Sequence, residues 1–248
     1  MKTETMEKIR SLRLPAFLDA YRKQVGSEME YETMSFHERL ALMVDAEHDS
    51  RHNNNIVRMI KNARFSDSSA FLGNIEYLPD RRLNRSLLES LADNEYIRQR
   101  LNVILVGATG CGKTYIANAL GVNACQNGYK AMYFRLPELF SELEAARVQG
   151  KYQQLMMRFR KCPLMILDEF LLVPASETEQ RDLLELAECR CGSSSLIVCS
   201  QIATEGWHER LGGGALADSI LDRVVPAAYV MTIEGDVSMR RRKRLVHQ

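Results

Sequence analysis

A glycine-rich stretch near the middle of the chain has the residue types that bind phosphate. It reads Gly107-Ala108-Thr109-Gly110-Cys111-Gly112-Lys113-Thr114, matches G-x-x-x-x-G-K-[ST] in full, and is followed by Tyr115 in a helical segment. The glycines let successive backbone N–H groups surround phosphate oxygens, and the dipole of the next helix adds positive potential. Lys113 is expected to bridge the β- and γ-phosphates, and the Thr114 hydroxyl to bind Mg²⁺. Residues 107–115 are therefore predicted to hold a nucleoside triphosphate.

An acidic pair supplies the second half of such a site. In LMILDEF, residues 164–170, four apolar residues place Asp168 at the carboxyl end of a predicted strand, where parallel sheets bind ligands. Asp168 is expected to hold magnesium directly or through water, and Glu169 to polarise a water for in-line attack on the γ-phosphate. Nucleotide hydrolysis is the favoured interpretation; binding without turnover is the alternative.

Three further polar residues are candidates for sensing or stabilising the γ-phosphate. Ser200 and Gln201 end the strand SLIVCSQ and either orient the attacking water or face solvent. Arg223 lies in ALADSILDRVV, a helical segment where an arginine can act as a finger on the nucleotide of a neighbouring subunit. The alternative for Arg223 is an intramolecular salt bridge to Asp218 or Asp222.

Basic residues gather in three local clusters, although the net charge is only +1. Residues 240–244 are five consecutive cations, typical of a solvated or phosphate-binding end, and Arg240 is placed to reach back toward bound nucleotide. The clusters at 81–85 and 158–161 each indicate either a contact with a nucleic-acid backbone or an ordinary helix surface.

The elements that must position these residues change in character near residue 98. Residues 1–98 read as helix only, with Pro15 breaking or kinking the first run. A capping box at Ser35 and Glu38 opens a helix that extends to about Arg64. We therefore predict a helical N-terminal domain over residues 1–98.

From residue 102 onward, short apolar runs alternate with amphipathic helices. The predicted strands are residues 102–107, 130–134, 164–169, 195–200 and 228–233. Near-continuous apolar strands separated by helices indicate a buried, mainly parallel α/β sheet with helices on both faces. Residues 99–248 are accordingly predicted to form the ATPase domain.

The composition excludes several classes of protein. With 248 residues, 46% of them hydrophobic, the chain can bury a sizeable core, and no apolar stretch reaches the roughly 18 residues that span a bilayer. The first residues, MKTETMEKIR, do not form a signal peptide, so a cytoplasmic protein is expected. The six cysteines lack zinc-binding spacing, and buried reduced thiols are expected.

The segments together resemble a known family over nearly the whole chain. GATGCGKTYIANALGVNAC, YFRLPELFSELEAAR, LMILDEF, QRDLLELAECR, VCSQ, WHERLG and ALADSILDR follow in the order typical of IstB-like AAA+ ATPases. IRSLRLPAFLDAYRKQ and SFHERLALMVDAEHDSRHNN resemble the helical N-terminal domain of that family. These proteins are transposition helpers of insertion sequences, related to the DnaC helicase loader and the DnaA initiator. The resemblance implies an AAA+ P-loop core, a three-layer α/β/α fold around a mainly parallel five-stranded sheet.

The resemblance also implies an activity and partners. It implies an ATPase that assembles as a homo-oligomer on double-stranded DNA with ATP and Mg²⁺, and that recruits or stimulates a partner transposase. Ser200 or Gln201 would be sensor 1, Arg223 the finger acting in trans and Arg240 sensor 2.

The chain departs from the family pattern at three positions near the site. Ala108, Tyr115 and Leu171 stand where Pro, His and Gly are common. None of the three is an expected ligand of magnesium or phosphate. Leu171 lies close to the expected γ-phosphate, so this departure bears on the rate of hydrolysis.

Two other classes of protein share part of this pattern. A helicase loader of the DnaC kind would have nearly the same core, but its N-terminal region needs a helicase-docking segment. A metabolic P-loop kinase would need a pocket for a small-molecule acceptor and no oligomer, and the pair Arg223 and Arg240 argues against it.

Overall fold

A five-stranded sheet forms the centre of the C-terminal part of the chain. The computed structural model describes residues 2–235, 238–239 and 241–242. The strands are β1 (Asn102–Gly107), β2 (Ala131–Arg135), β3 (Leu164–Asp168), β4 (Ser195–Ser200) and β5 (Ala228–Ile233). They lie in the order β2-β3-β4-β1-β5, and every neighbouring pair is parallel. All five predicted strands are confirmed, with ends that differ by at most one residue.

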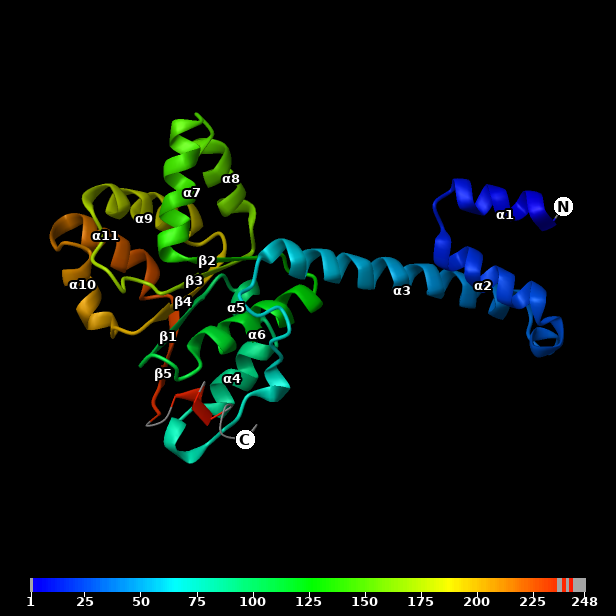
Figure 1. The fold of residues 1–248 in the computed structure, drawn as a ribbon, viewed down its shortest axis with the longest axis horizontal. Helices are drawn as coiled ribbons and strands as arrows, with labels where there is room; N and C mark the ends of the chain where they lie inside the picture. The colour runs from blue at the N-terminus through cyan, green and yellow to red at the C-terminus, as the bar shows by residue number, and fades with distance from the viewer. Residues whose placement is uncertain (1, 236–237, 240, 243–248) are drawn as a thin grey trace. The chain divides into compact units, whose positions relative to one another are not determined.

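Helices cover both faces of this sheet, which confirms the predicted three-layer α/β/α fold. The α-helices of the whole described chain, including those outside the sheet layers, are α1 (Lys2–Ser11), α2 (Pro15–Gly26), α3 (Phe36–Ala63), α4 (Arg85–Ala92), α5 (Glu95–Arg98), α6 (Lys113–Gln126), α7 (Leu136–Val148), α8 (Tyr152–Lys161), α9 (Glu177–Arg190), α10 (Trp207–Arg210) and α11 (Gly214–Val224). Figure 1 shows α4 and α6 on one side of the sheet and α7, α8, α9 and α11 on the other. None of the described helices combines the length and the hydropathy needed to cross a membrane.

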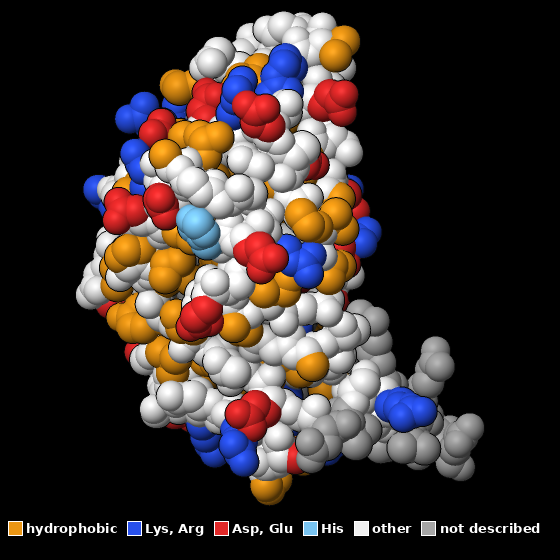
Figure 2. All heavy atoms as spheres, turned by 90° about the vertical axis from the view of Figure 1, so that its left-hand side faces the viewer, with side chains coloured by type: hydrophobic (Ala, Val, Ile, Leu, Met, Phe, Trp, Pro, Cys, Tyr) orange, Lys and Arg blue, Asp and Glu red, His pale blue; other side chains and the backbone are white. Residues whose placement is uncertain are grey.

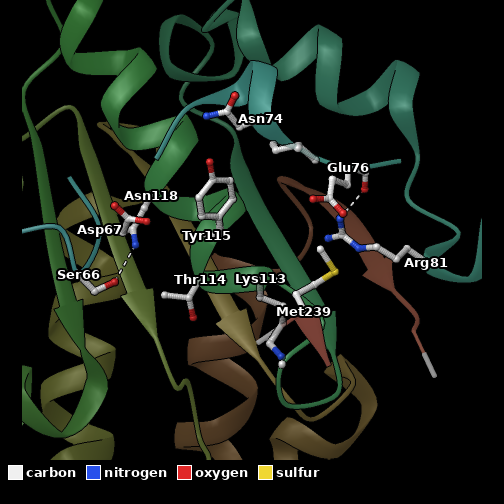
Figure 3. Close-up of a pocket in the computed structure, with 13 residues that line it drawn as sticks. Ser66, Asp67, Asn74, Glu76, Arg81, Lys113, Thr114, Tyr115, Asn118 and Met239 are labelled. Carbon is white, nitrogen blue, oxygen red and sulfur yellow. Dashed lines mark hydrogen bonds between the residues drawn. The ribbon is translucent and has the colours of Figure 1, made fainter. Parts of the chain in front are cut away.

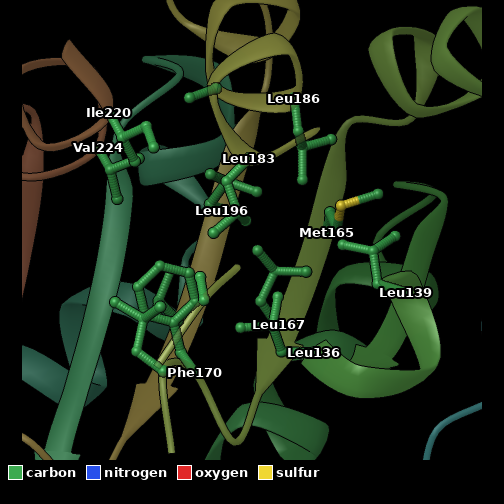
Figure 4. Packing of buried hydrophobic residues seen from close by; sticks show 14 of the residues in the cluster. Leu136, Leu139, Met165, Leu167, Phe170, Leu183, Leu186, Leu196, Ile220 and Val224 are labelled. Atoms are coloured by element: carbon green, nitrogen blue, oxygen red, sulfur yellow. The ribbon is translucent and has the colours of Figure 1, made fainter. Parts of the chain in front are cut away.

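The main hydrophobic core lies between the sheet and the layer of α7, α8, α9 and α11 (Figure 4). Successive residues of a strand point to opposite faces, so alternate residues such as Met165 and Leu167 of β3 reach this core. Ile166 points to the other face, where a Cβ added at Gly121 of α6 would lie 2.9 Å from its side chain. A sheet covered on both faces needs apolar side chains on both, so the middle of each strand is mostly apolar. This local pattern is the reason that the strands could be predicted from the sequence.

The chain divides into two compact units, residues 1–58 and 59–248. In the first unit Pro15 is the first residue of α2, a position that needs no N–H donor. The carboxylate of Glu47, on α3, accepts hydrogen bonds from the backbone N–H groups of Ala16 at 2.9 Å and Phe17 at 3.1 Å. The predicted domain boundary near residue 98 stays a prediction.

The predicted capping box at the start of α3 is present. The N–H of Ser35 donates to Glu38 Oε2 at 2.7 Å, and the N–H of Glu38 donates to Ser35 Oγ at 3.3 Å. Hydrogen bonds from Ser35 lower the pKa of the Glu38 carboxyl. The helix then runs to Ala63, one residue short of the predicted end.

The cysteines are free thiols, and four of them are buried as predicted: Cys111, Cys125, Cys162 and Cys199. Cys191 is exposed, so the expectation of a buried thiol is wrong there, because the residue follows the end of α9 in a surface turn. Within the described residues, no group of three or more His, Cys, Asp or Glu side chains is arranged to hold a metal ion.

A buried arginine, Arg190, ties the end of α9 to the edge of the sheet. Its guanidinium donates to the backbone carbonyls of Phe159, of Cys162 at 3.1 Å and of Ser195 at 2.7 Å, and burial lowers its pKa to about 10. Since the side chain is only 1% exposed, its loss would leave three carbonyls without donors in a cavity.

We expect Arg190→Ala to lower the free energy of unfolding by about 3 kcal/mol. Urea unfolding followed by circular dichroism would measure the change. Arg181→Ala is the matched control on the same helix, because Arg181 is exposed and pairs with Glu177 one turn away. Its effect should stay within about 0.5 kcal/mol. Equal effects of the two substitutions would show that the Arg190 hydrogen bonds contribute little.

Candidate active site

The phosphate loop connects β1 to α6 at the carboxyl edge of the sheet. Gly110 and Gly112 have φ values of 83° and 100°, a region that only glycine adopts without strain. Lys113 is the first residue of α6, and its ammonium donates to the carbonyls of Gly107 at 2.6 Å and Ala108 at 2.9 Å. The loop therefore surrounds a buried positive charge at a helix N-terminus, the arrangement that binds phosphate.

The predicted magnesium ligands lie in direct contact. Thr114 Oγ1 donates to Asp168 Oδ2 at 2.7 Å, and the hydroxyl of Tyr133 donates to the same oxygen at 2.9 Å. The N–H of Glu169 donates to Asp168 Oδ1 at 2.8 Å. A threonine hydroxyl and a carboxylate are hard oxygen donors, and Mg²⁺ typically takes few protein ligands and completes its shell with phosphate and water. This pair fits magnesium.

Tyr133 was missed by the sequence reasoning, because a tyrosine inside an apolar strand looks like core. Burial and the Asp168 charge raise the pKa of Tyr133, so its hydroxyl stays a donor. It orients Asp168 from the neighbouring strand, β2.

The carboxylate of Glu169 is held by Arg135, which also went unrecognised. Arg135 Nη2 lies 3.0 Å from Glu169 Oε1 and 2.8 Å from Oε2, and the ion pair raises the pKa of Arg135. Glu169 has a φ of 56°, which turns the chain sharply after β3. A signal was available, since Arg135 is the polar residue that ends β2 just as Asp168 ends β3.

The two candidates at the end of β4 have different surroundings. Ser200 is fully buried; its hydroxyl donates to the Phe170 carbonyl at 2.9 Å and accepts from Ile202 and Trp207. Gln201 is exposed, and its Oε1 accepts a hydrogen bond from Thr109 Oγ1 of the phosphate loop at 2.6 Å. Of the two, Gln201 is the residue whose side chain forms a hydrogen bond with the loop in the described structure.

Arg223 lies outside this cluster. Its guanidinium donates to the Ser219 carbonyl at 2.7 Å and pairs with Glu188 of α9 at 3.0 Å. The predicted salt bridge therefore forms with a different partner from Asp218 or Asp222, because packing of α9 on α11 brings Glu188 to the guanidinium. Figure 2 shows the face on the left of Figure 1, where α10 and α11 lie, with positive, negative and hydrophobic side chains interspersed.

A cavity of about 300 Å³ adjoins the phosphate loop (Figure 3). Its lining residues come from the segment before α4, from the loop and start of α6, and from near the C-terminus; they are Ser66, Asp67, Asn74, Ile75, Glu76, Arg81, Gly110, Gly112, Lys113, Thr114, Tyr115, Asn118 and Met239. Figure 3 shows Tyr115 and Asn118 on one wall, with Arg81 and Met239 on the other. Residues 66–81, which the sequence reasoning left unassigned or treated as surface, thus complete the site.

Ser238 and Met239, which precede the C-terminal basic cluster, contact the phosphate loop. The N–H of Met239 donates to the Gly110 carbonyl at 2.9 Å, and a Cβ added at Gly110 would lie 2.3 Å from Ser238 Oγ. Arg240, the predicted sensor 2, lies outside the described residues. In the cluster at 81–85, Arg81 is only 4% exposed, so it is neither an ordinary surface residue nor open to a nucleic-acid backbone.

The sheet has the order β2-β3-β4-β1-β5 and lies between helical layers, with a phosphate loop after β1 and an acidic pair after β3. These features define a P-loop protein of the AAA+ class. The model of the IstB-like ATP binding protein family matches residues 7–246. The chain belongs to this family.

Two relatives agree with this assignment. An insertion-sequence ATP-binding protein of Sinorhizobium fredii is 33% identical over 240 residues, which cover 97% of each chain. An insertion-sequence ATP-binding protein of Pseudomonas fluorescens is 36% identical over 202 residues, covering 82% of this chain and 87% of that protein.

Two solved structures show the same fold. DnaA from Aquifex aeolicus with bound AMPPCP has a TM-score of 0.59 at 18% identity, covering 74% of this chain and only 57% of that one. The DnaC helicase loader has a TM-score of 0.54 at 17% identity, covering 66% of this chain and 97% of that one.

Proposed function

We propose that this protein is a Mg²⁺-dependent ATPase that assembles on double-stranded DNA and recruits or stimulates a partner transposase. The observation that carries the catalytic part is the contact of Thr114 with Asp168 beside Glu169, at the mouth of the phosphate loop. The transposition part is supported by the relatives, which are named as ATP-binding proteins of insertion sequences.

The proposed roles follow the geometry. Residues 107–115 hold the phosphates of ATP, Thr114 and Asp168 hold Mg²⁺, and Glu169 is the general base. Bound Mg²⁺ would neutralise charge on the β- and γ-phosphates. Gln201 is the better candidate for sensing the γ-phosphate, because the Ser200 hydroxyl already bonds to Phe170 within the core.

Two arginines would complete the site. We propose Arg223 as a finger that acts on the nucleotide of a neighbouring subunit, since its contacts are with α9 and α11 and it does not line the cavity of its own chain. Arg240 as sensor 2 is proposed from the family alone. The assembly would be a homo-oligomer in the cytoplasm, with residues 1–98 as its helical N-terminal domain and 99–248 as its ATPase domain.

A second candidate function is loading of a replicative helicase. The observation that favours it is the match to the DnaC loader, which covers 97% of the solved DnaC chain. That match rests on the core, which both kinds of protein share, so the partner must be identified directly.

The experiment combines turnover, assembly and partner capture. Purified protein with ATP, Mg²⁺ and duplex DNA should hydrolyse ATP faster than without DNA, and electron microscopy with a slowly hydrolysed analogue should show a ring or filament on DNA. Immobilised protein should retain a cognate transposase and not a replicative helicase. Retention of the helicase alone would favour the loader, and a monomer whose turnover ignores DNA would contradict both candidates.

A further inference from the structure

Arg81 is a buried cation on the wall of the nucleotide cavity. It closes the short 3₁₀ turn Pro79–Arg81 and is only 4% exposed. Its Nη1 donates to the Glu76 carbonyl at 2.5 Å, and its Nη2 donates to the Cys111 carbonyl of the phosphate loop at 2.9 Å. Its Nε is buried and has no hydrogen-bond partner among the described residues.

No carboxylate of the described residues lies within ion-pair distance of this guanidinium. The adjacent carboxylate, Asp80, pairs with Arg242, and Glu76 gives Arg81 its backbone carbonyl while its side chain is exposed. Burial lowers the pKa of Arg81, which reflects the cost of holding a charge away from water. A buried charge of this kind is usually paired, and because Arg81, unlike Arg190, lines the cavity beside the phosphate loop, an anion can approach it there.

Lys113 has the same unusual surroundings across the loop. It is 7% exposed, lines the same cavity, and bonds to two backbone carbonyls with no carboxylate of the described chain in range. Arg81 and Lys113 are therefore two buried cations bonded to the carbonyls of one loop and facing one cavity. Such a pair is suited to a polyphosphate, which carries several negative charges over a short length.

The guanidinium of Arg81 packs directly against the phosphate loop. A Cβ added at Gly112 would lie 2.9 Å from Arg81 Nη2, so a side chain at this position would displace the guanidinium from its present place, and the φ of 100° separately favours glycine. The hydrogen bond to the Cys111 carbonyl holds that peptide from outside the loop.

We propose that Arg81 is a nucleotide-binding residue that positions the phosphate loop through Cys111 and supplies a second buried positive charge to the phosphates of ATP. The inference rests on the proposed ATPase function and adds a residue from outside the G-x-x-x-x-G-K-[ST] motif to the phosphate site. Arg81 would raise the affinity for the nucleotide electrostatically. The affinity should therefore depend on the charge of residue 81 and on the phosphates of the ligand, and not on its base.

The test is calorimetric titration of the full chain with ATP and, separately, with inorganic tripolyphosphate. Arg81→Met should weaken the binding of both ligands by about 10- to 100-fold, because it removes a charged hydrogen-bond donor. Arg81→Lys, which keeps the charge, should recover a substantial part of that affinity. Arg82→Met is the matched control: Arg82 is the next residue, is exposed and pairs with Glu234, and its loss should change affinity by less than about twofold.

Melting curves without ligand accompany each titration. Arg81→Met with normal melting and unchanged affinity would overturn the inference while the ATPase proposal stands. Loss of ATP binding with tripolyphosphate binding intact would place Arg81 against the base or ribose and also overturn it. If both Arg81 variants unfold, the residue is a structural tie and the inference is wrong. A wild-type chain that binds no ATP contradicts the proposed function itself.

Discussion

Glu169→Gln should lower the turnover of ATP by about 10²- to 10⁴-fold while leaving the Kd for ATP nearly unchanged. The amide keeps the size of the side chain but cannot accept the proton of the attacking water. ATP affinity comes mainly from the phosphate loop, which Glu169 does not contact in the described structure. Steady-state phosphate release and fluorescent-nucleotide binding would measure the two quantities, and the DNA-bound assembly should be long-lived because hydrolysis no longer ends it.

Glu138→Gln is the matched control for this prediction. Glu138 is also bonded to Arg135, with its Oε1 3.3 Å from Nη1, but it lies in the first turn of α7 rather than at the end of β3. Both variants lose one carboxylate contact of the same arginine, and only Glu169→Gln should stop turnover. Unchanged turnover in Glu169→Gln would remove this residue from the role of base.

Arg223→Ala should lower DNA-stimulated hydrolysis by about 10³-fold or more, with ATP affinity close to that of the wild type. A finger supplies positive charge only to the transition state at a subunit interface, so its loss is felt in turnover and not in binding by the monomer. Phosphate release with and without duplex DNA, together with nucleotide titration, would measure both effects.

Two further measurements separate a finger from a structural salt bridge. Glu188→Gln removes the intramolecular partner of Arg223 and should leave DNA-stimulated turnover in place, since a half-exposed pair contributes about 1 kcal/mol or less. Mixing Arg223→Ala with Glu169→Gln should restore part of the turnover, because some interfaces then combine an intact Glu169 with an intact Arg223. If Arg223→Ala melts early and the mixture stays inactive, the arginine acts in its own chain.

The ion pair between Arg135 and Glu169 has a consequence for both predictions. While Arg135 holds both oxygens of Glu169, the carboxylate is engaged away from an attacking water. Each group is partly exposed, so the pair is weak and can exchange for other partners. Turnover therefore requires this pair to open, which costs about 1 kcal/mol or less.

Much of the fold was predictable because its signals are local. Each strand has five or six residues, most of them apolar, because a parallel sheet between two helical layers requires apolar side chains on both faces. The capping box at Ser35 and the break at Pro15 act through the backbone of their own helices. Local signals of this kind do not depend on what the rest of the chain does.

The contacts of the site were harder to predict because they join distant segments. Gln201 reaches Thr109, Arg135 reaches Glu169, and Arg81 reaches Cys111. No periodicity in the sequence relates these pairs, and Arg81 in particular stands in a basic run that looks like a surface. Parallel topology gave a partial guide, because it places the ends of β1, β3 and β4 at one edge.

The sequence by itself determined the phosphate loop, the acidic pair and the sheet that carries them, because glycine φ values, helix dipoles and apolar strands are properties of short segments. Only the tertiary structure decided which cations serve the site. The fold buries Arg81 beside the phosphate loop, where it bonds to the Cys111 carbonyl. Packing of α11 on α9 instead places Arg223 in an ion pair with Glu188. The charge of an arginine is the same in every sequence, but the water, carbonyls or carboxylates around it are set by the fold.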